Sequence, residues 1–218
     1  KKLKKNPKTI VFTEGSDSRI LEAASKLLAS NFLTPILLGD PDEITRVAEE
    51  DGDNIRGAVI IDPKNYEKMD DVVNAFCEIR KSKGMTPEQA LPIVSQGNYF
   101  GTMLVQMGIA DCLLGGATYS TADTVRPALQ IIKTKPGNSI ISSCFILVRT
   151  AATGGNEVVA MGDCAINIHP NEDELVEICH ETAECAKVFG VEPKVAFLSF
   201  STNGSAKDPD VTKMRNAA

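Results

Sequence analysis

Tryptophan is absent from the 218 residues, histidine occurs only twice, and three tyrosines and eight phenylalanines supply all the aromatic rings. No apolar run approaches the ~20 residues that an α-helix needs to span a bilayer. Acidic residues outnumber basic ones by 29 to 23, which gives a net charge of −6. Because a protein that neutralises nucleic-acid phosphates needs a broad basic face, this composition argues against nucleic acid and against a membrane as the main partner.

The cysteines form no CxxC pair, and no signal peptide precedes them. We therefore expect reduced, mostly buried thiols in a cytoplasmic protein. No carboxylate stands at a spacing from His169 or His180 that is typical of a metal site or a catalytic triad. We therefore expect neither a metal site nor a Ser–His–Asp hydrolase. The six cysteines are Cys77, Cys112, Cys144, Cys164, Cys179 and Cys185.

Strand and helix signals alternate through the first half of the chain, which predicts βαβ units and a mainly parallel sheet. Apolar residues at helical spacing predict a long helix over about 65–83, and Pro87 suits the first turn of another. Buried strands are expected at 9–12, 35–39, 57–62 and 110–117, and further helices from Ser16, from Pro41 and through Leu129.

The second half has a different pattern. A strand at 139–148, the adjacent glycines of TGGNE at 153–157 and a second apolar run predict a long hairpin. Asn171 should cap an acidic-led helix, which Gly190 can end. KVAFLSF at 194–200 reads as another buried strand, and a last helix starts after Pro209. Since an α/β protein seldom ends on half a helix, we expect the chain to be incomplete at its C-terminus.

Two polar loops follow buried strands: GGATYST at 115–121 and STNGSA at 201–206. In open α/β sheets, ligands bind outside the carboxyl ends of strands, where N–H groups and hydroxyls can converge on an anion. Turns rich in capping residues explain the same composition equally well. Neither loop matches the nucleotide fingerprints GxxxxGKS/T or GxGxxG, so the residues alone leave both interpretations open.

Arg126 strengthens the anion interpretation of the first loop, because a guanidinium is a two-pronged donor suited to phosphate. Pro127 is tolerated only where a helix is just beginning, so we expect Arg126 near the positive N-terminus of that helix. Arg80 stands beside Lys81 and Lys83 at the end of the long helix. There a favourable interaction with the helix dipole is the simpler explanation.

Several segments, taken together and in this order, resemble the phosphate acetyltransferases, also called phosphotransacetylases. The related phosphate butyryltransferases share the architecture, but TVRPALQIIKTKPG and GDCAIN are more similar to the acetyl enzymes. The resemblance covers nearly the whole chain. The segments are IVFTEG, RKSKGMTPEQA, GNYFGTMLVQMGIADCLLGGATYSTADTVRPALQIIKTKPG, SIISSCFIL, MGDCAINIHPNEDELVEI and VAFLSFSTNGSA.

The resemblance implies reversible acetyl transfer between acetyl phosphate and coenzyme A, without a metal or a permanently bound cofactor. It implies a homodimer with a fold like that of the isocitrate and isopropylmalate dehydrogenases, in which the site lies in a cleft between two α/β domains. By this resemblance the first domain covers 1–138 and lacks its C-terminal return segment, and 139–218 is part of the second.

Arg80 and Arg126 match family arginines implicated in binding coenzyme A, and this overrides the dipole interpretation of Arg80. The family's general base and an adjoining serine–arginine pair would follow residue 218. We therefore assign no catalytic residue and expect the chain alone to be inactive. From the two loops we add residues that would line the cleft for acetyl phosphate: Ser120, Thr121, Thr124, Ser201, Thr202, Asn203 and Gly204.

Other functions stay open beside the acetyltransferase. They are a phosphate butyryltransferase and a non-catalytic module that binds coenzyme A or phosphate. A dehydrogenase of the related fold would need NAD(P) and a metal-binding aspartate cluster, which the sequence does not show. Phosphotransacetylase domains also occur fused behind other domains, as in some malic enzymes.

Overall fold

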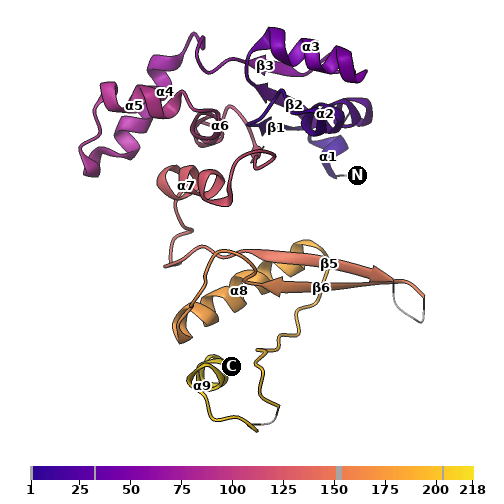
Figure 1. The fold of residues 1–218 in the computed structure, drawn as a ribbon, viewed down its shortest axis with the longest axis vertical. Helices are drawn as coiled ribbons and strands as arrows, with labels where there is room; N and C mark the ends of the chain where they lie inside the picture. Colours follow the sequence, from indigo (N-terminus) through magenta and orange to yellow (C-terminus); the bar gives the residue numbers. More distant parts are fainter. Residues whose placement is uncertain (1, 32, 151–153, 203) are drawn as a thin grey trace. The chain divides into compact units, whose positions relative to one another are not determined.

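The computed structural model describes residues 2–31, 33–150, 154–202 and 204–218 (Figure 1). The chain forms two compact units, Lys1–Lys133 (unit 1) and Thr134–Ala218 (unit 2). The domain boundary predicted between 138 and 139 lies a few residues after the boundary between the two units. Within the described ranges, no helix is both long and apolar enough to cross a bilayer.

Unit 1 is built on a four-stranded parallel sheet of order β3-β2-β1-β4, which confirms the predicted parallel sheet. The chain moves outward from β1 to β2 and β3 and then returns to the other side of β1 as β4. The direction of winding therefore reverses between β1 and β4, and such a switch point is where open α/β sheets bind ligands. The strands are β1 (Lys8–Phe12), β2 (Leu33–Leu38), β3 (Val59–Ile61) and β4 (Cys112–Leu114).

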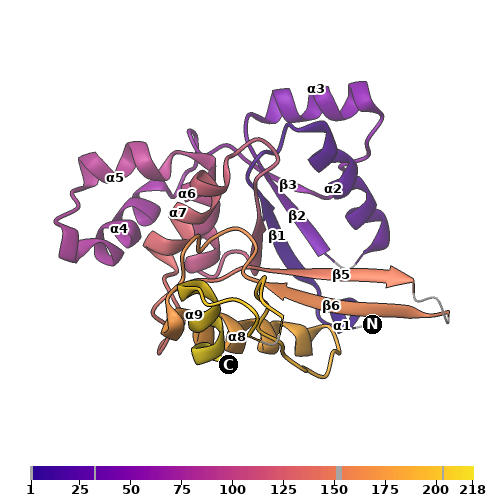
Figure 2. The ribbon, with the colours of Figure 1, turned by 60° about the horizontal axis from the view of Figure 1, so that its bottom comes forward.

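Helices cover both faces of this sheet (Figures 1 and 2). Successive strand residues point to opposite faces. Val11 thus joins the core beneath α4, α5, α6 and α7, whereas Phe12 joins the core beneath α2 and α3. The helices of unit 1 are α1 (Lys2–Lys5), α2 (Ser18–Ser30), α3 (Pro41–Asp51), α4 (Met69–Ile79), α5 (Pro87–Val94), α6 (Gly97–Gln106) and α7 (Thr121–Ile131), with a 3-10 turn at Lys81–Lys83.

Local capping sets where these helices begin and end. The side chains of Asp17 and Asp40 accept N–H groups at the first turns of α2 and α3. The helix predicted over 65–83 is shorter than expected, because Arg80 leaves helical conformation at φ −101° and ψ 13°. The chain continues there as the 3-10 turn, which ends at Gly84 with φ 68°.

A proline lies in the interior of α7. The helix begins at Thr121, so the expected position of Arg126 beside its N-terminus is wrong. Pro127 has no N–H to donate to the carbonyl of Asp123, four residues earlier. The side-chain amide of buried Asn98, on α6, donates to that carbonyl at 2.8 Å instead. A partner from another helix therefore replaces the hydrogen bond that the proline removes.

Unit 2 contains the predicted hairpin. Strands β5 (Cys144–Thr150) and β6 (Asn156–Gly162) pair antiparallel, and Gly154 and Gly155 adopt φ of 82° and 91° in the turn. Helix α8 (Glu172–Val188) packs along the hairpin, and Asn171 caps it as predicted from the sequence. Asn171 and Glu174 form a reciprocal capping box. Helix α9 (Pro209–Ala217) contacts α8 through a 2.7 Å hydrogen bond from Asn216 Nδ2 to Glu172 Oε1.

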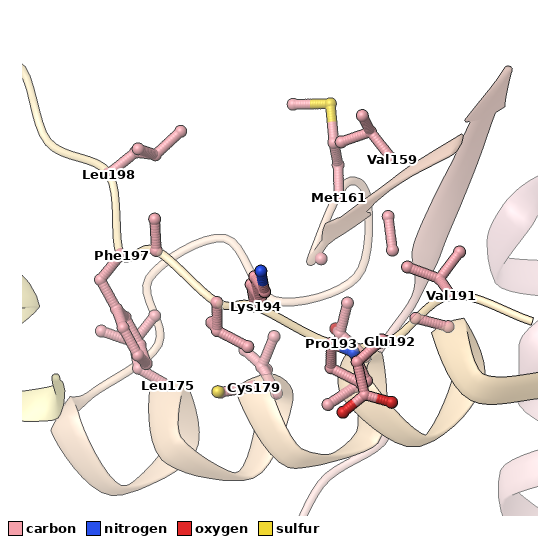
Figure 3. Close-up of a pocket in the computed structure, with 18 of the residues that line it drawn as sticks. Val159, Met161, Leu175, Cys179, Val191, Glu192, Pro193, Lys194, Phe197 and Leu198 are labelled. Atoms are coloured by element: carbon pink, nitrogen blue, oxygen red, sulfur yellow. The ribbon is translucent and has the colours of Figure 1, made fainter. Parts of the chain in front are cut away.

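Residues 194–200 do not form the buried strand that their composition predicts. The sheet of unit 2 contains β5 and β6 alone among the described residues. Residues 194–200 do not pair with either strand, so they have no ladder of backbone hydrogen bonds. Phe197 lies beside Leu175 of α8 (Figure 3). Leu198 and Phe200 are 70% and 71% exposed. The apolar composition of this segment is typical of a buried strand, but a strand also requires a partner strand, which a local pattern does not reveal.

The prediction of mostly buried thiols is wrong. Cys112 and Cys164 are exposed, and the other four cysteines are half-buried. The Sγ atoms of Cys144 and Cys185 lie 3.1 Å apart, and this hydrogen bond, with burial, raises the pKa of Cys144 to about 11. Because the thiolate is the reactive form, Cys144 is a poor nucleophile at neutral pH.

The contact between Asn98 and Asp123 predicts a compensating pair of substitutions. Asn98→Ala should lower the free energy of unfolding by about 2 kcal/mol, because it leaves a partly buried carbonyl without its donor. Pro127→Ala restores a backbone N–H opposite that carbonyl. It should therefore stabilise the Asn98→Ala protein more than it stabilises the wild type. Urea denaturation of the two single variants, the double variant and the wild type measures this coupling.

Pro92, in the interior of α5, offers a matched control. Pro92→Ala should have the same effect on stability with or without Asn98. Strictly additive effects of Asn98→Ala and Pro127→Ala would contradict the exchange of partners at Asp123.

Candidate functional site

The carboxyl ends of β1 and β4 lie side by side at the switch point, and glycines let the chain approach closely there. A Cβ on Gly115 would lie 2.6 Å from Thr13 Oγ1, and one on Gly97 would lie 3.0 Å from the Thr13 carbonyl oxygen. A Cβ on Gly15 would lie 2.6 Å from the carbonyl oxygen of Leu38. Backbone packing at the end of β2 therefore requires Gly15, whereas Gly97 and Gly115 allow close approach to the carbonyl oxygen and the hydroxyl of Thr13.

The carboxylate of Glu14 fills the loop that the sequence marks as an anion site. Oε1 accepts the backbone N–H groups of Thr118 at 2.6 Å and Tyr119 at 3.0 Å, and Oε2 accepts that of Gly116 at 3.1 Å. The hydroxyls of Thr13 and Thr118 donate to the same carboxylate at 2.9 and 3.3 Å. Convergent N–H groups of this kind make an anion-binding concavity. Here an internal carboxylate occupies it.

The charge state of Glu14 follows from these contacts. Burial raises the pKa of Glu14, but the donors of Thr118, Tyr119, Thr13 and Gly116 outweigh burial and hold the pKa below its usual value. The group is therefore ionised at neutral pH. Because the folded pKa is depressed, its stabilising contribution is present above the unfolded pKa and is lost as the pH falls through the folded pKa.

Arg19 contacts the same loop. Its Nη2 donates to the carbonyl of Ala117 at 2.7 Å, and Asp17 orients the guanidinium through bonds of 2.9 and 2.7 Å. Since the side chain of Arg19 is 68% exposed, this contact contributes less than the half-buried contacts of Glu14. Side chains of residues 14–19 thus bond both the backbone N–H groups and a backbone carbonyl of residues 116–119.

The hydroxyls predicted to line the cleft take part in the first turn of α7. Ser120 is the N-cap: its Oγ accepts the Asp123 N–H at 3.1 Å and donates to Asp123 Oδ2 at 2.7 Å. The Thr124 hydroxyl donates to the Ser120 carbonyl at 3.0 Å, and Thr121 is exposed. The structure accounts for Ser120 as the N-cap and for Thr124 as a side chain bonded within the first turn, and the predicted role of all three toward acetyl phosphate stays a prediction.

The two arginines differ in their surroundings. Arg126 is exposed on α7, and its guanidinium lies 3.8 Å from Asp123, at the limit of an ion pair. Arg80 lies at the C-terminal end of α4, where its Nε is buried and has no hydrogen-bond partner among the described residues. Its neighbour Lys81 pairs with Glu78 at 3.3 Å. Among the described residues, no side chain links the two arginines by bonding to both.

The second predicted loop belongs to unit 2 and is organised by its own hydroxyls. Ser201 Oγ accepts the N–H of Ala206 at 3.0 Å, and Ser205 Oγ accepts that of Thr202 at 3.2 Å. Gly204 has a φ of 75°. Asn203 lies outside the described residues. The contacts of Ser201 and Thr202 are therefore those of a turn.

A pocket of about 660 Å³ lies in unit 2 between β6, α8 and residues 191–198 (Figure 3). Its walls are mostly apolar, and Glu192 and Lys194 are its charged lining residues. One amine beside a carboxylate does not supply the several donors that a phosphate group requires. The pocket contains none of the predicted site residues. Elsewhere in the described ranges, no cluster of three or more potential metal ligands is present.

Glu14 and Asn98 were not among the predicted site residues. Glu14 lies two residues after the end of an apolar strand, where side chains can face a switch point, so its place in IVFTEG was an available signal. Asn98 gave no comparable signal, because its partner is the carbonyl that Pro127 leaves free on another helix.

An open parallel sheet with helices on both faces and polar loops at the carboxyl ends of its strands places unit 1 in the class of open α/β proteins, in which ligands generally bind at a switch point. The chain belongs to the phosphate acetyl/butaryl transferase family, whose model matches residues 1–218. The resemblance inferred from the sequence segments is confirmed.

Among individual relatives, a phosphate acetyltransferase of Bacillus subtilis (strain 168) is 52% identical over 208 residues, which cover 95% of this chain and 62% of the relative. One from Staphylococcus epidermidis is 49% identical, with 95% and 61% covered. The chain therefore spans less than two thirds of the length of these relatives.

Two solved structures match nearly the whole chain. The EutD phosphotransacetylase from Staphylococcus aureus has a TM-score of 0.87 and 47% identity, covering 99% of this chain and 64% of its own. A phosphotransacetylase from Streptococcus pyogenes has a TM-score of 0.89 and 46% identity, covering 99% and 66%.

The dual interpretation of Ser120 can be tested by comparing two replacements. Ser120→Ala should lower the free energy of unfolding by about 1 kcal/mol, because the Asp123 N–H loses its acceptor. Ser120→Asn keeps an N-cap oxygen and should stay within a few tenths of a kcal/mol of the wild type. Thermal denaturation at fixed pH measures both. Equal destabilisation by the two replacements would contradict the capping role.

Proposed function

We propose that the whole protein transfers an acetyl group reversibly between acetyl phosphate and coenzyme A, giving acetyl-CoA and phosphate. The observation that carries this proposal is the family match over residues 1–218, supported by relatives named phosphate acetyltransferase at 52% and 49% identity. The two solved structures named phosphotransacetylase support it as well.

In this reaction the sulfur of coenzyme A attacks the acetyl carbonyl carbon. A carbon–sulfur bond forms, the bond from that carbon to the phosphate oxygen breaks, and the thiol loses its proton. Because a free thiol has a pKa of ~8.5, a base that accepts this proton accelerates the reaction at neutral pH. We assign no general base to residues 1–218. The base and the serine–arginine pair stay predictions for a segment that would follow residue 218.

We assign Arg126 and Arg80 to the binding of coenzyme A, through its phosphate groups. The guanidinium of Arg126 is exposed, and among the described residues its ion-pair contact is the 3.8 Å approach to Asp123, so it is accessible to a ligand. The partnerless Nε of Arg80 is a buried donor, which an anionic ligand would satisfy. A guanidinium binds phosphate through two parallel hydrogen bonds, which a lysine cannot reproduce.

The proposal includes the finer features implied by the family. They are a fold of the isocitrate and isopropylmalate dehydrogenase type with a cleft between two α/β domains, a homodimer, a cytoplasmic location, and catalysis without a metal or a permanently bound cofactor. Acetyl phosphate would meet polar groups from the two loops, namely Ser120, Thr121, Thr124, Ser201, Thr202, Asn203 and Gly204. Family membership supports these features.

The activity is tested with the full gene product, acetyl phosphate and coenzyme A. Thioester formation, followed by its ultraviolet absorbance, should be faster with acetyl phosphate than with butyryl phosphate. A preference for butyryl phosphate would redefine the acyl substrate. No thioester with either acyl phosphate, from a folded protein, would contradict the proposed reaction.

Arg126→Ala and Arg80→Ala should each raise the KM for coenzyme A by roughly 10- to 100-fold, because each removes a charge-assisted hydrogen bond to the ligand. The KM for acetyl phosphate and the melting temperature should change little. Arg46→Ala is the control, since Arg46 lies on α3 and pairs with Glu50, four residues later on the same helix. An unchanged KM for coenzyme A in a folded arginine variant would remove that arginine from the site.

A further inference from the structure

We propose that Glu14 is a positioning residue for coenzyme A binding: its carboxylate occupies the amide nest of residues 116–119 and thereby holds α7, and Arg126 on it, against the sheet. The amide nest is defined by the N–H groups of Gly116, Thr118 and Tyr119. The inference rests on the proposed function, because it takes Arg126 as a ligand of coenzyme A.

The anchor is rigid on the side of Glu14. Glu14 follows β1, the strand that pairs with both β2 and β4, and the preceding residues Val11, Phe12 and Thr13 are 0%, 1% and 6% exposed. Gly15 donates its N–H to the Leu38 carbonyl at 2.9 Å, which fixes the backbone on the other side. The carboxylate is thus held at a defined place at the end of the sheet.

The nest connects directly to α7. Tyr119, whose N–H the carboxylate accepts, precedes Ser120, the N-cap of that helix. Farther along, α7 is held by α6 through Asn98 at the Asp123 carbonyl and through the Tyr99 hydroxyl, 3.1 Å from Gln130 Oε1. Glu14 therefore fixes the start of α7, and α6 fixes its middle and end.

In the part of the chain that the structure describes, no hydrogen bond or ion pair from outside α7 holds the guanidinium of Arg126. Its guanidinium is exposed, and the 3.8 Å approach to Asp123 joins two residues of the same helix. Its position relative to the sheet is consequently the position of α7. Because a small misplacement of a binding group lowers affinity strongly, the seating of α7 should be visible in the binding of coenzyme A.

The nest requires an anion in particular. Five donors point at the Glu14 carboxylate, namely three backbone N–H groups and the hydroxyls of Thr13 and Thr118. A glutamine at this position would present its NH₂ group to one set of N–H donors. Glu14→Gln therefore keeps the shape of the side chain while it breaks part of the anchor.

The occupied nest also bears on substrate binding. The backbone donors of Gly116, Thr118 and Tyr119 already have an acceptor, so they are not the groups that bind the phosphate of a substrate. Loop 115–119 acts as structural support for the arginine-bearing helix. The cluster of anion-binding groups in the sequence thus serves an anion of the same chain.

The test is a double-mutant cycle in the full gene product, with kcat and both KM values measured for wild type, Glu14→Gln, Arg126→Ala and the double variant. We expect Glu14→Gln to raise the KM for coenzyme A roughly tenfold, with a much smaller change in the KM for acetyl phosphate. In the Arg126→Ala background it should add little, because no guanidinium remains to be positioned.

Asp111→Asn is the matched control. Asp111 accepts Lys8 Nζ at 2.6 Å, the Thr9 N–H at 2.8 Å and the Thr9 hydroxyl at 3.0 Å, so it joins β1 and β4 at the opposite end of the same strands. Its replacement should lower the melting temperature without changing the KM for coenzyme A. An equal rise in that KM for Asp111→Asn and Glu14→Gln would overturn the inference, because general loosening of the sheet would then explain both.

A second measurement uses Glu14→Ala, which empties the nest. Added formate should lower the KM for coenzyme A toward the wild-type value, because a small carboxylate can occupy the nest, whereas chloride at the same ionic strength should not. If Glu14→Ala does not fold, recovery of its folding by formate but not by chloride supports the anchor in the same way. Absence of any formate effect on a folded variant overturns it.

The outcomes separate this inference from the proposed function. An inactive wild type contradicts the proposed function. An active wild type in which Arg126→Ala raises the KM for coenzyme A and Glu14→Gln does not contradicts only the positioning role. Additive effects of Glu14→Gln and Arg126→Ala contradict it as well.

Discussion

The hydrogen bonds between the Glu14 carboxylate and three backbone N–H groups join the two strands at the switch point of unit 1. Parallel strands are connected by long crossovers, so strands that are neighbours in the sheet can lie far apart in the sequence. Glu14, after β1, and Thr118, after β4, are about one hundred positions apart and bond to each other. Arg19 adds a contact with the carbonyl of Ala117 in the loop after β4. By the proposed positioning role, the Glu14 carboxylate sets the direction in which α7 leaves the sheet.

In the same region, packing compensates for a proline inside a helix and depends on glycines at close backbone contacts. Pro127 removes a backbone donor inside α7, and buried Asn98 replaces it from α6. Gly97 and Gly115 let the backbone approach Thr13 closely enough for the network to close. The helix that carries Arg126 is thus fixed at its start by a charge and along its length by α6, as the proposed role of Arg126 in binding coenzyme A requires.

Much of the architecture could be predicted from local patterns. Periodicity and capping residues located the strands of unit 1, the hairpin around Gly154 and Gly155 and the helix after Asn171, because each depends on residues close in sequence. The errors have a common physical cause. Among the described residues, 194–200 have no partner strand. The carbonyl that Pro127 leaves without a donor is bonded by Asn98 of another helix. The N–H groups of GGATYST bond the carboxylate of Glu14, about one hundred residues earlier. Long-range partners are not visible in a local pattern. Ser120 and Thr124 raise a different difficulty, because hydroxyls that bond within the first turn of a helix have the same composition as hydroxyls that bind a ligand.

The central claim is that an ionised Glu14 occupies the nest, and its titration by ¹³C NMR tests this most directly. The account predicts that the Glu14 carboxyl titrates below the ordinary glutamate pKa of about 4.3, and that the amide protons of Thr118 and Tyr119 shift with the same midpoint. A midpoint at or above the ordinary value, with amide protons that do not respond, would contradict the account.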